Sequence, residues 1–187
     1  MRLTEDRYSR DRLRLDVAIR FIENEARTHT IRTWTGLSDD RIRKLYKTYL
    51  ADAGRGTVVR HRGRSPHQAA HFTRTARLRH ESAVFASICL MLGLARAQPG
   101  QVPRRPLPDV QLAALLCQAY EAYRMLVERP IISFEHAVLL VTSLGRNEEL
   151  GYGQCEHCRA LVIVDRLSLR AAQCGSCAPA PGEPPRP

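Results

Sequence analysis

Four cysteines near the end of the chain have the residue type and the spacing of a metal-binding cluster. Cys155 and Cys158 form one Cys-x-x-Cys pair, and Cys174 and Cys177 form a second pair after fifteen intervening residues. Two residues between cysteines let both sulfur atoms face inward around a tight turn, and a second pair completes a tetrahedron around one ion. We therefore predict a closed four-thiolate site that holds one structural Zn²⁺ per chain.

Two other chemistries use paired cysteines, namely thiol–disulfide exchange and iron–sulfur ligation. A redox enzyme usually needs a single pair that opens a helix, whereas these two pairs flank a β-branched run at 160–164 that predicts a strand. A closed thiolate shell leaves no position for a substrate, so the predicted ion stabilises the segment and does not catalyse. Gly175 suits a tight turn, His157 is expected to be exposed, and Cys89 and Cys117 are expected to be buried.

The charge of the chain indicates a polyanionic or acidic partner. The 187 residues carry a net charge of +10, and only Lys44 and Lys47 among the 29 basic residues are lysines. Arginine presents a planar guanidinium that binds phosphate and guanine edges through two hydrogen bonds. A positive excess of this kind is typical of nucleic-acid binding, with a solvated charged face as the alternative.

Two regions concentrate these basic residues. One is the helix expected after Asp39, and the other is the stretch 53–80, which has seven arginines and no acidic residue, so its guanidinium groups are not expected to be neutralised locally. Aromatic residues make up only 6%, which disfavours a stacking platform for single strands and favours duplex DNA. The candidate DNA-contacting residues are Arg41, Arg43, Lys44, Lys47, Arg60, Arg62, Arg64, Arg74, Arg77 and Arg79.

The remaining pattern predicts a mainly α-helical body. Apolar spacing predicts a helix from Leu13, and residues 28–49 have the outline of a helix-turn-helix, with Gly36 in the turn and Ser38 capping the second helix. The predicted divisions are a flexible N-terminus (1–12), a helical body that binds partner and DNA (13–150), a four-cysteine zinc ribbon (151–177) and a disordered proline-rich tail (178–187).

Proline-rich and helix-capping residues divide the second half of the body into further segments. Residues 98–108 hold four prolines and predict a linker, after which Asp109 caps an amphipathic helix. Ser133 is expected to cap the next helix and Gly145 to end it. The first thirty residues contain no apolar run of signal-peptide length, and the longest apolar stretch, near 83–97, is too short to span a bilayer, so we expect a cytoplasmic protein with reduced thiols.

Several of these segments, taken in order, form a series. Residues 35–50 read TGLSDDRIRKLYKTYL, and they are followed by a loop with glycine and proline at 63–66 and an apolar helix at 84–94. The sequence AYEAY at 119–123 and the cluster CEHC…CGSC complete the series. The whole resembles the family of FlhC, a subunit of the bacterial flagellar master transcription activator, from about residue 13 to residue 177. The loop is richer in arginine than in better-known members of that family, and the chain ends in a short proline-rich segment instead of their longer basic tail.

The resemblance implies a zinc-binding subunit that assembles with an FlhD-type protein in a ring-like hetero-oligomer, a heterohexamer. It also implies that promoter DNA wraps around the assembly, that RNA polymerase is recruited to flagellar operons, and that the four cysteines are the zinc ligands. We therefore expect a non-enzymatic, DNA-binding subunit of a transcription activator. An RNA-binding zinc-ribbon protein and a thiol-redox protein remain the alternatives.

Overall fold

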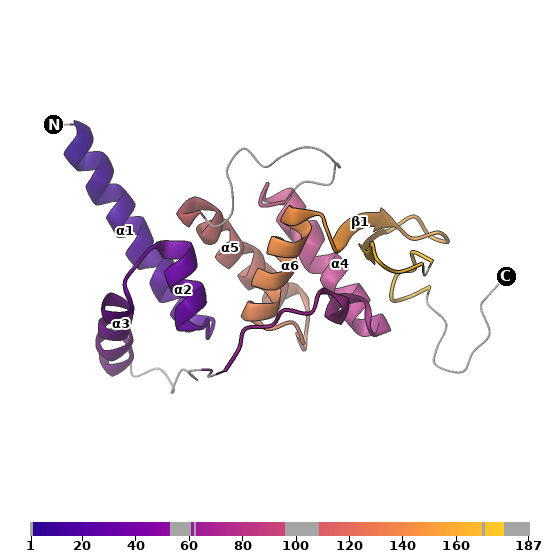
Figure 1. The fold of residues 1–187 in the computed structure, drawn as a ribbon, viewed down its shortest axis with the longest axis horizontal. Helices are drawn as coiled ribbons and strands as arrows, with labels where there is room; N and C mark the ends of the chain where they lie inside the picture. The colour runs from indigo at the N-terminus through magenta and orange to yellow at the C-terminus, as the bar shows by residue number, and fades with distance from the viewer. Residues whose placement is uncertain (1, 53–60, 62, 96–108, 170, 178–187) are drawn as a thin grey trace. The chain divides into compact units, whose positions relative to one another are not determined.

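The computed structural model describes residues 2–52, 61, 63–95, 109–169 and 171–177 (Figure 1). They fall into two compact units. Unit 1 comprises Met1–Ser65 and Arg104–Gln118, and unit 2 comprises Pro66–Pro103 and Ala119–Pro187. Most described residues are helical, which confirms the predicted mainly α class. The predicted linker at 98–108 and tail at 178–187 lie outside the described residues.

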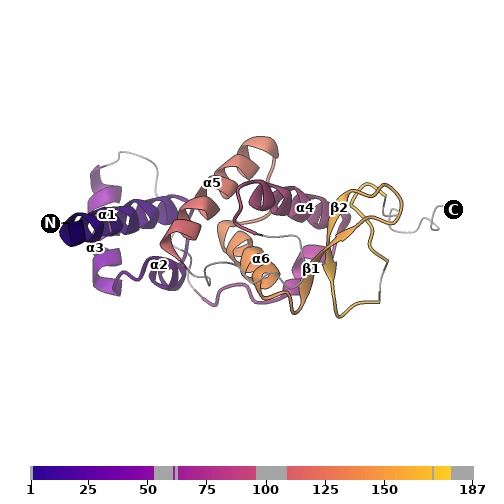
Figure 2. The same ribbon diagram turned by 90° about the horizontal axis from the view of Figure 1, so that it is seen from above.

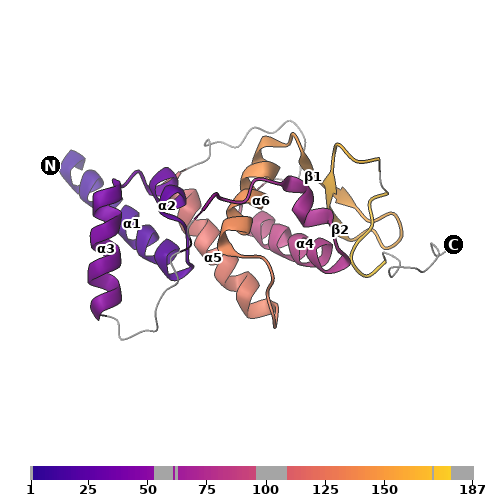
Figure 3. The same cartoon turned by 60° about the horizontal axis from the view of Figure 1, so that its bottom comes forward.

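Within the described residues, unit 1 contains three whole helices that pack against one another, together with the first part of a fourth (Figure 3). The whole helices are α1 (Arg2–Glu23), α2 (Thr28–Thr35) and α3 (Asp39–Asp52). The sequence predicts a helix only from Leu13, but α1 begins at Arg2, so the helix includes most of the segment expected to be flexible. Its buried face includes Phe21, whose ring centroid lies 6.5 Å from that of Trp34 on α2.

The predicted turn between α2 and α3 is confirmed. Gly36 follows α2 with a φ of 70°, a left-handed conformation that glycine adopts without strain. The hydroxyl of Ser38 then accepts a hydrogen bond from the backbone N–H of Arg41 at 3.4 Å, as an N-cap does. Tyr46 on α3 donates to the carbonyl of Ala26 at 3.1 Å, which ties the helix pair to the end of α1.

The helices of unit 2 are η1 (Ala69–Thr73), α4 (Ala76–Met91), the second part of α5 (Val110–Leu126) and α6 (Phe134–Arg146). Asp109 caps α5 in unit 1, and Ser133 caps α6, as predicted. The prediction that Gly145 ends α6 is wrong. The helix continues to Arg146 and ends at Asn147, whose φ of 57° is a left-handed conformation that asparagine tolerates.

A buried carboxylate organises the helical core of unit 2. Glu81 on α4 is only 2% exposed and accepts hydrogen bonds from the hydroxyl of Tyr123 and from the backbone N–H of Ile131 at 2.9 Å. The Nε of Arg77, one turn away, donates to the same carboxylate at 2.8 Å. Burial raises the pKa of Glu81, but these hydrogen bonds and the arginine charge outweigh it, so its pKa lies below the ordinary value.

The chain then enters a two-stranded antiparallel sheet beside α4 and α6 (Figure 2). Strand β1 (Leu150–Gln154) pairs with β2 (Leu161–Asp165) so that Tyr152 lies opposite Ile163. The strand predicted at 160–164 is therefore confirmed with a shift of one residue. Among the described helices, none combines the length and the apolar character needed to cross a membrane.

Candidate metal centre

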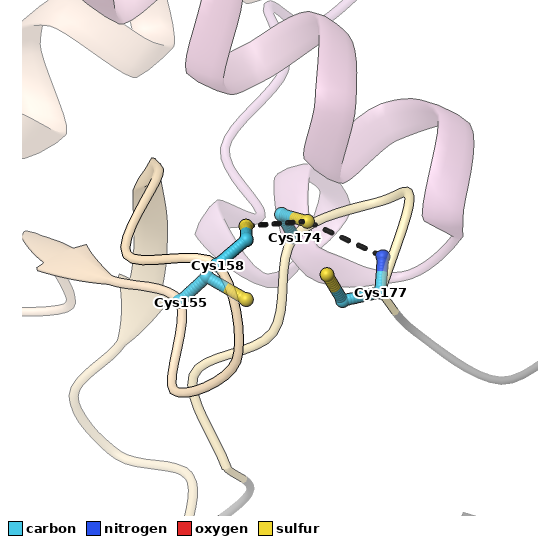
Figure 4. Close-up of side chains that lie close together, drawn as sticks. All are labelled: Cys155, Cys158, Cys174 and Cys177. Carbon is cyan, nitrogen blue, oxygen red and sulfur yellow. Dashed lines mark hydrogen bonds between the residues drawn. The ribbon is translucent and has the colours of Figure 1, made fainter. Parts of the chain in front are cut away.

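The structure brings the four cysteines of the sequence pattern together. Cys155 and Cys158 lie on the loop that joins β1 to β2, and Cys174 and Cys177 lie on the segment after β2. All four sulfur atoms are within 4.8 Å of one another, and the side chains converge on one point (Figure 4). Four thiols that face a common centre can hold a metal ion.

The four thiols are not disulfide-bonded. The sulfur atoms of Cys158 and Cys174 are 3.7 Å apart, far beyond a disulfide bond of about 2.05 Å. Cys155 is fully buried, Cys158 is exposed, and the other two are partly buried. The cluster therefore reaches from the interior of the unit, at Cys155, to its surface, at Cys158.

Backbone hydrogen bonds shape the two turns that carry the cysteines. The N–H of Cys155 donates to the carbonyl of Ala160 at 2.8 Å, and Arg159 turns the chain into β2 with a φ of 62°. In the second turn the N–H of Cys177 donates to the sulfur of Cys174 at 3.3 Å. N–H groups that face sulfur stabilise its thiolate form, which is the form that binds a metal.

The thiols differ in how readily they lose a proton. Backbone N–H groups of Cys158 and Cys174 donate to Cys155 and lower its pKa to about 6. Hydrogen bonds with the sulfur atoms of Cys174 and Cys158 raise the pKa of Cys177 to about 12. Of these two thiols, Cys155 therefore ionises more readily, and the thiolate is the form that binds a metal.

Gly175 joins the second turn to α4. A Cβ atom at this position would collide with the carbonyl oxygen of Ala76 and lie 2.9 Å from the Cβ of His80. Gly175 lies in a turn, as predicted, but its φ is not in the left-handed region, so close approach to α4 is what requires glycine. Sequence reasoning missed this contact because Gly175 and Ala76 are far apart in the chain.

The other cysteines and the nearby histidine behave as predicted. His157 is exposed, and its Nε2 lies 3.4 Å from the side-chain nitrogen of Gln173 instead of joining the sulfur cluster. Cys89 and Cys117 are fully buried in helices. Burial raises the pKa of the Cys89 thiol to about 12, so this group stays protonated at neutral pH.

The basic residues predicted on α3 are accessible. The side chains of Arg41, Arg43, Lys44 and Lys47 are all exposed. Arg43 also forms an exposed ion pair with Asp40 at 2.9 Å, which contributes little to stability and can exchange for another anion. These four side chains belong to unit 1, together with exposed Arg64.

The arginines of the acid-free stretch have different surroundings. Arg60 and Arg62 lie outside the described residues, and Arg74 is exposed. The expectation that no carboxylate neutralises this stretch is wrong for Arg77, because Glu81 lies one helical turn beyond it and pairs with its guanidinium. Arg79 is partly buried, and its Nη1 donates to the carbonyl of Thr73 at 3.1 Å.

Comparison with known proteins adds no assignment to this geometry. No protein-family model matches the chain, and no curated protein matches it.

Proposed function

We propose that this protein is a non-enzymatic, DNA-binding subunit of a transcription activator, of the FlhC type, that acts with an FlhD-type partner. The observation that carries the proposal is the convergence of Cys155, Cys158, Cys174 and Cys177 on one centre. The resemblance assigns the zinc ligands to these four positions, and it joins them to the motif at 35–50 in a single order along the chain. The assignment to the FlhC type rests on these motifs and their order.

Zinc is the metal that the donor set favours. A tetrahedral ion with Zn–S bonds of about 2.3 Å places its sulfur ligands about 3.8 Å apart. The distance of 3.7 Å between the sulfur atoms of Cys158 and Cys174 agrees with that value. Four thiolates with no open position suit a structural ion, which would stabilise the turns of the ribbon.

The exposed basic groups supply the affinity for DNA in this proposal. The face of α3 carries two arginines and two lysines within seven residues, at 41, 43, 44 and 47. Such a face can enter a major groove or contact phosphates. Each phosphate that is neutralised releases counterions, so binding should weaken steeply as salt increases. With the partner in place, the bound subunit would recruit RNA polymerase to promoters, flagellar ones among them.

Co-expression with the FlhD-type protein tests the proposal. We expect the two chains to copurify, with one zinc ion per chain of this protein, and to prefer promoter duplex over structured RNA in competition at fixed salt. Neutralising Arg60, Arg62 and Arg64 together should flatten the dependence of DNA binding on salt. A preference for RNA would favour an RNA-binding zinc protein, and metal-free protein with alkylation-sensitive cysteines would favour a thiol-redox protein.

A further inference from the structure

A cavity of about 680 Å³ lies in unit 2 next to the metal centre. One side is formed by η1 and the start of α4, and the other by β2 and the segment that leads into Cys174. Its polar lining residues are Thr73, Arg74, Arg79, Asp165, Ser168 and Gln173. The cavity thus joins the acid-free arginine stretch to the cysteine ribbon.

The charges around this cavity favour an anion. Neither Arg74 nor Arg79 lies within salt-bridge distance of a carboxylate in the described part of the chain. Asp165 is the one acidic residue among the lining residues, and its Oδ1 accepts a hydrogen bond from the N–H of Leu167 at 2.9 Å. Two guanidinium groups therefore face the cavity against one carboxylate, which is already hydrogen-bonded.

Arg79 is held in position with hydrogen-bonding capacity left over. Its Nη1 donates to the carbonyl of Thr73, which fixes the end of the side chain against η1. Its Nε is buried and has no hydrogen-bond partner within the described residues. A guanidinium held in this way loses little freedom on binding a second group, and a phosphate oxygen is the acceptor that its planar fork suits best.

One wall of the cavity is fixed by the turns that carry the cysteines. The carbonyl of Ala172 accepts from the N–H of Glu156 at 2.9 Å, and the N–H of Ala172 donates to the Glu156 carboxylate at 3.4 Å. Gly175 holds the same segment against α4. The wall at 171–173 leads directly into Cys174, whose sulfur lies 3.7 Å from that of Cys158, so an ion bound by both cysteines would hold the wall further.

We propose that this cavity is a phosphodiester-binding subsite, formed by Arg74 and Arg79, that is complete only when the metal centre is filled. The inference rests on the proposed function, because the phosphodiester would come from duplex DNA. It adds a specific site and a condition for that site. The metal ion would then set the affinity for DNA through the cavity wall without touching the nucleic acid.

The duplex experiment compares Arg74→Ala/Arg79→Ala with Arg146→Ala/Arg124→Ala in the full chain with its partner. Both double variants lose two exposed or partly exposed arginines of unit 2, but only the first pair lines the cavity. With a fluorescent duplex, we expect the first variant to bind on the order of tenfold more weakly. Its plot of log affinity against log salt should also be shallower by about one unit. Equal behaviour of the two variants, both with normal metal content, would overturn the subsite.

The metal condition is tested on the full chain with inorganic phosphate as the probe. We expect phosphate to shift the side-chain Nε NMR signals of Arg74 and Arg79 in metal-loaded protein and not after chelation, while circular dichroism shows intact helices. If chelation unfolds the helices, the Gly175→Ala variant serves as the alternative test. This substitution should displace the wall without removing a sulfur ligand. Undiminished shifts in the metal-free protein would overturn the metal condition, and undiminished shifts in Gly175→Ala would overturn the role of the wall.

The two proposals fail differently. Wild-type protein that binds no duplex, yet shows the phosphate shifts, would refute the proposed function and keep the subsite. Wild-type protein that binds duplex with no contribution from Arg74 and Arg79 would keep the function and refute the subsite.

Discussion

The helices and the ribbon of unit 2 are stabilised by different means. The helices bury large side chains: Phe85, Tyr120 and Tyr123 are in mutual ring contact, and Phe134 contacts Tyr120. The ribbon has two strands of five residues each, and Leu169 beside it is fully exposed. A two-stranded sheet is marginal in water by itself. We therefore expect burial to stabilise the helices, whereas the ribbon would gain its stability from a bound ion and from its packing on α4 and α6.

Removing one sulfur ligand should give the largest separation between the two regions. We expect Cys174→Ser to abolish metal binding and to unfold the ribbon, because an apparent metal-binding free energy of about 10–16 kcal/mol is coupled to the folding of such sites. Hydrogen exchange should accelerate across 150–177 and stay slow in α4 and α6, and assembly with the partner should decrease. His157→Ala is the control, since this residue lies outside the sulfur cluster. Normal zinc content in Cys174→Ser would contradict the account.

Replacing the buried carboxylate of Glu81 should destabilise the helices and leave the ribbon and its metal binding intact. Glu81→Ala leaves the hydroxyl of Tyr123 and the N–H of Ile131 without their acceptor, at a cost of roughly 1–3 kcal/mol for each buried group. Urea unfolding followed by helical circular dichroism measures the loss. Tyr123→Phe removes the hydroxyl that donates to Glu81 and accepts from the N–H of Ile132 at 3.2 Å, so it should destabilise the helices as well. An unchanged midpoint in Glu81→Ala would show that the network does not stabilise the helices.

A methyl group at Gly175 should weaken the contact between the two regions. We expect Gly175→Ala to destabilise the ribbon by about 1–3 kcal/mol, the usual cost of overpacking, because its Cβ meets the backbone of Ala76. Resistance of the bound metal to a competing chelator is the measurement. Ser176→Ala, at the exposed neighbouring position, should behave like wild type. Equal chelator resistance of both variants would exclude the close approach.

Acid should affect the two regions in sequence. Metal affinity should decrease as the pH is lowered, because protons compete with the metal for the thiolates. It should decrease further below a pH of about 6, where Cys155 takes up its proton. The pKa of Glu81 is lowered on folding, so the stability from its ionised form is present above the ordinary value of 4.5 and is lost as pH falls through the folded value. As the pH is lowered, metal release should therefore precede unfolding of the helices. Glu81→Gln should change the pH dependence of helix unfolding and leave that of metal release unchanged. Simultaneous transitions would contradict this order.

The features that could be predicted from sequence are those with local causes. The cysteine pairs, the strand at 160–164 and the caps at Ser38 and Ser133 each depend on residues a few positions apart. The pairing of Arg77 with Glu81 is also local, but Glu81 lies one residue beyond the acid-free stretch 53–80 and is not part of the prediction. The bond from Tyr123 to Glu81 spans 42 residues, and no pattern of spacing announces such a contact.

Because Cys89 and Cys117 are buried, the number of reactive thiols in the folded protein would report whether the four clustered cysteines hold an ion. A thiol-specific dye added to folded protein should stain none of the six cysteines while the ion is bound, and four after the ion is withdrawn. The last two should become stained only when the helices melt. One titration thus reads ligation and global unfolding as separate steps.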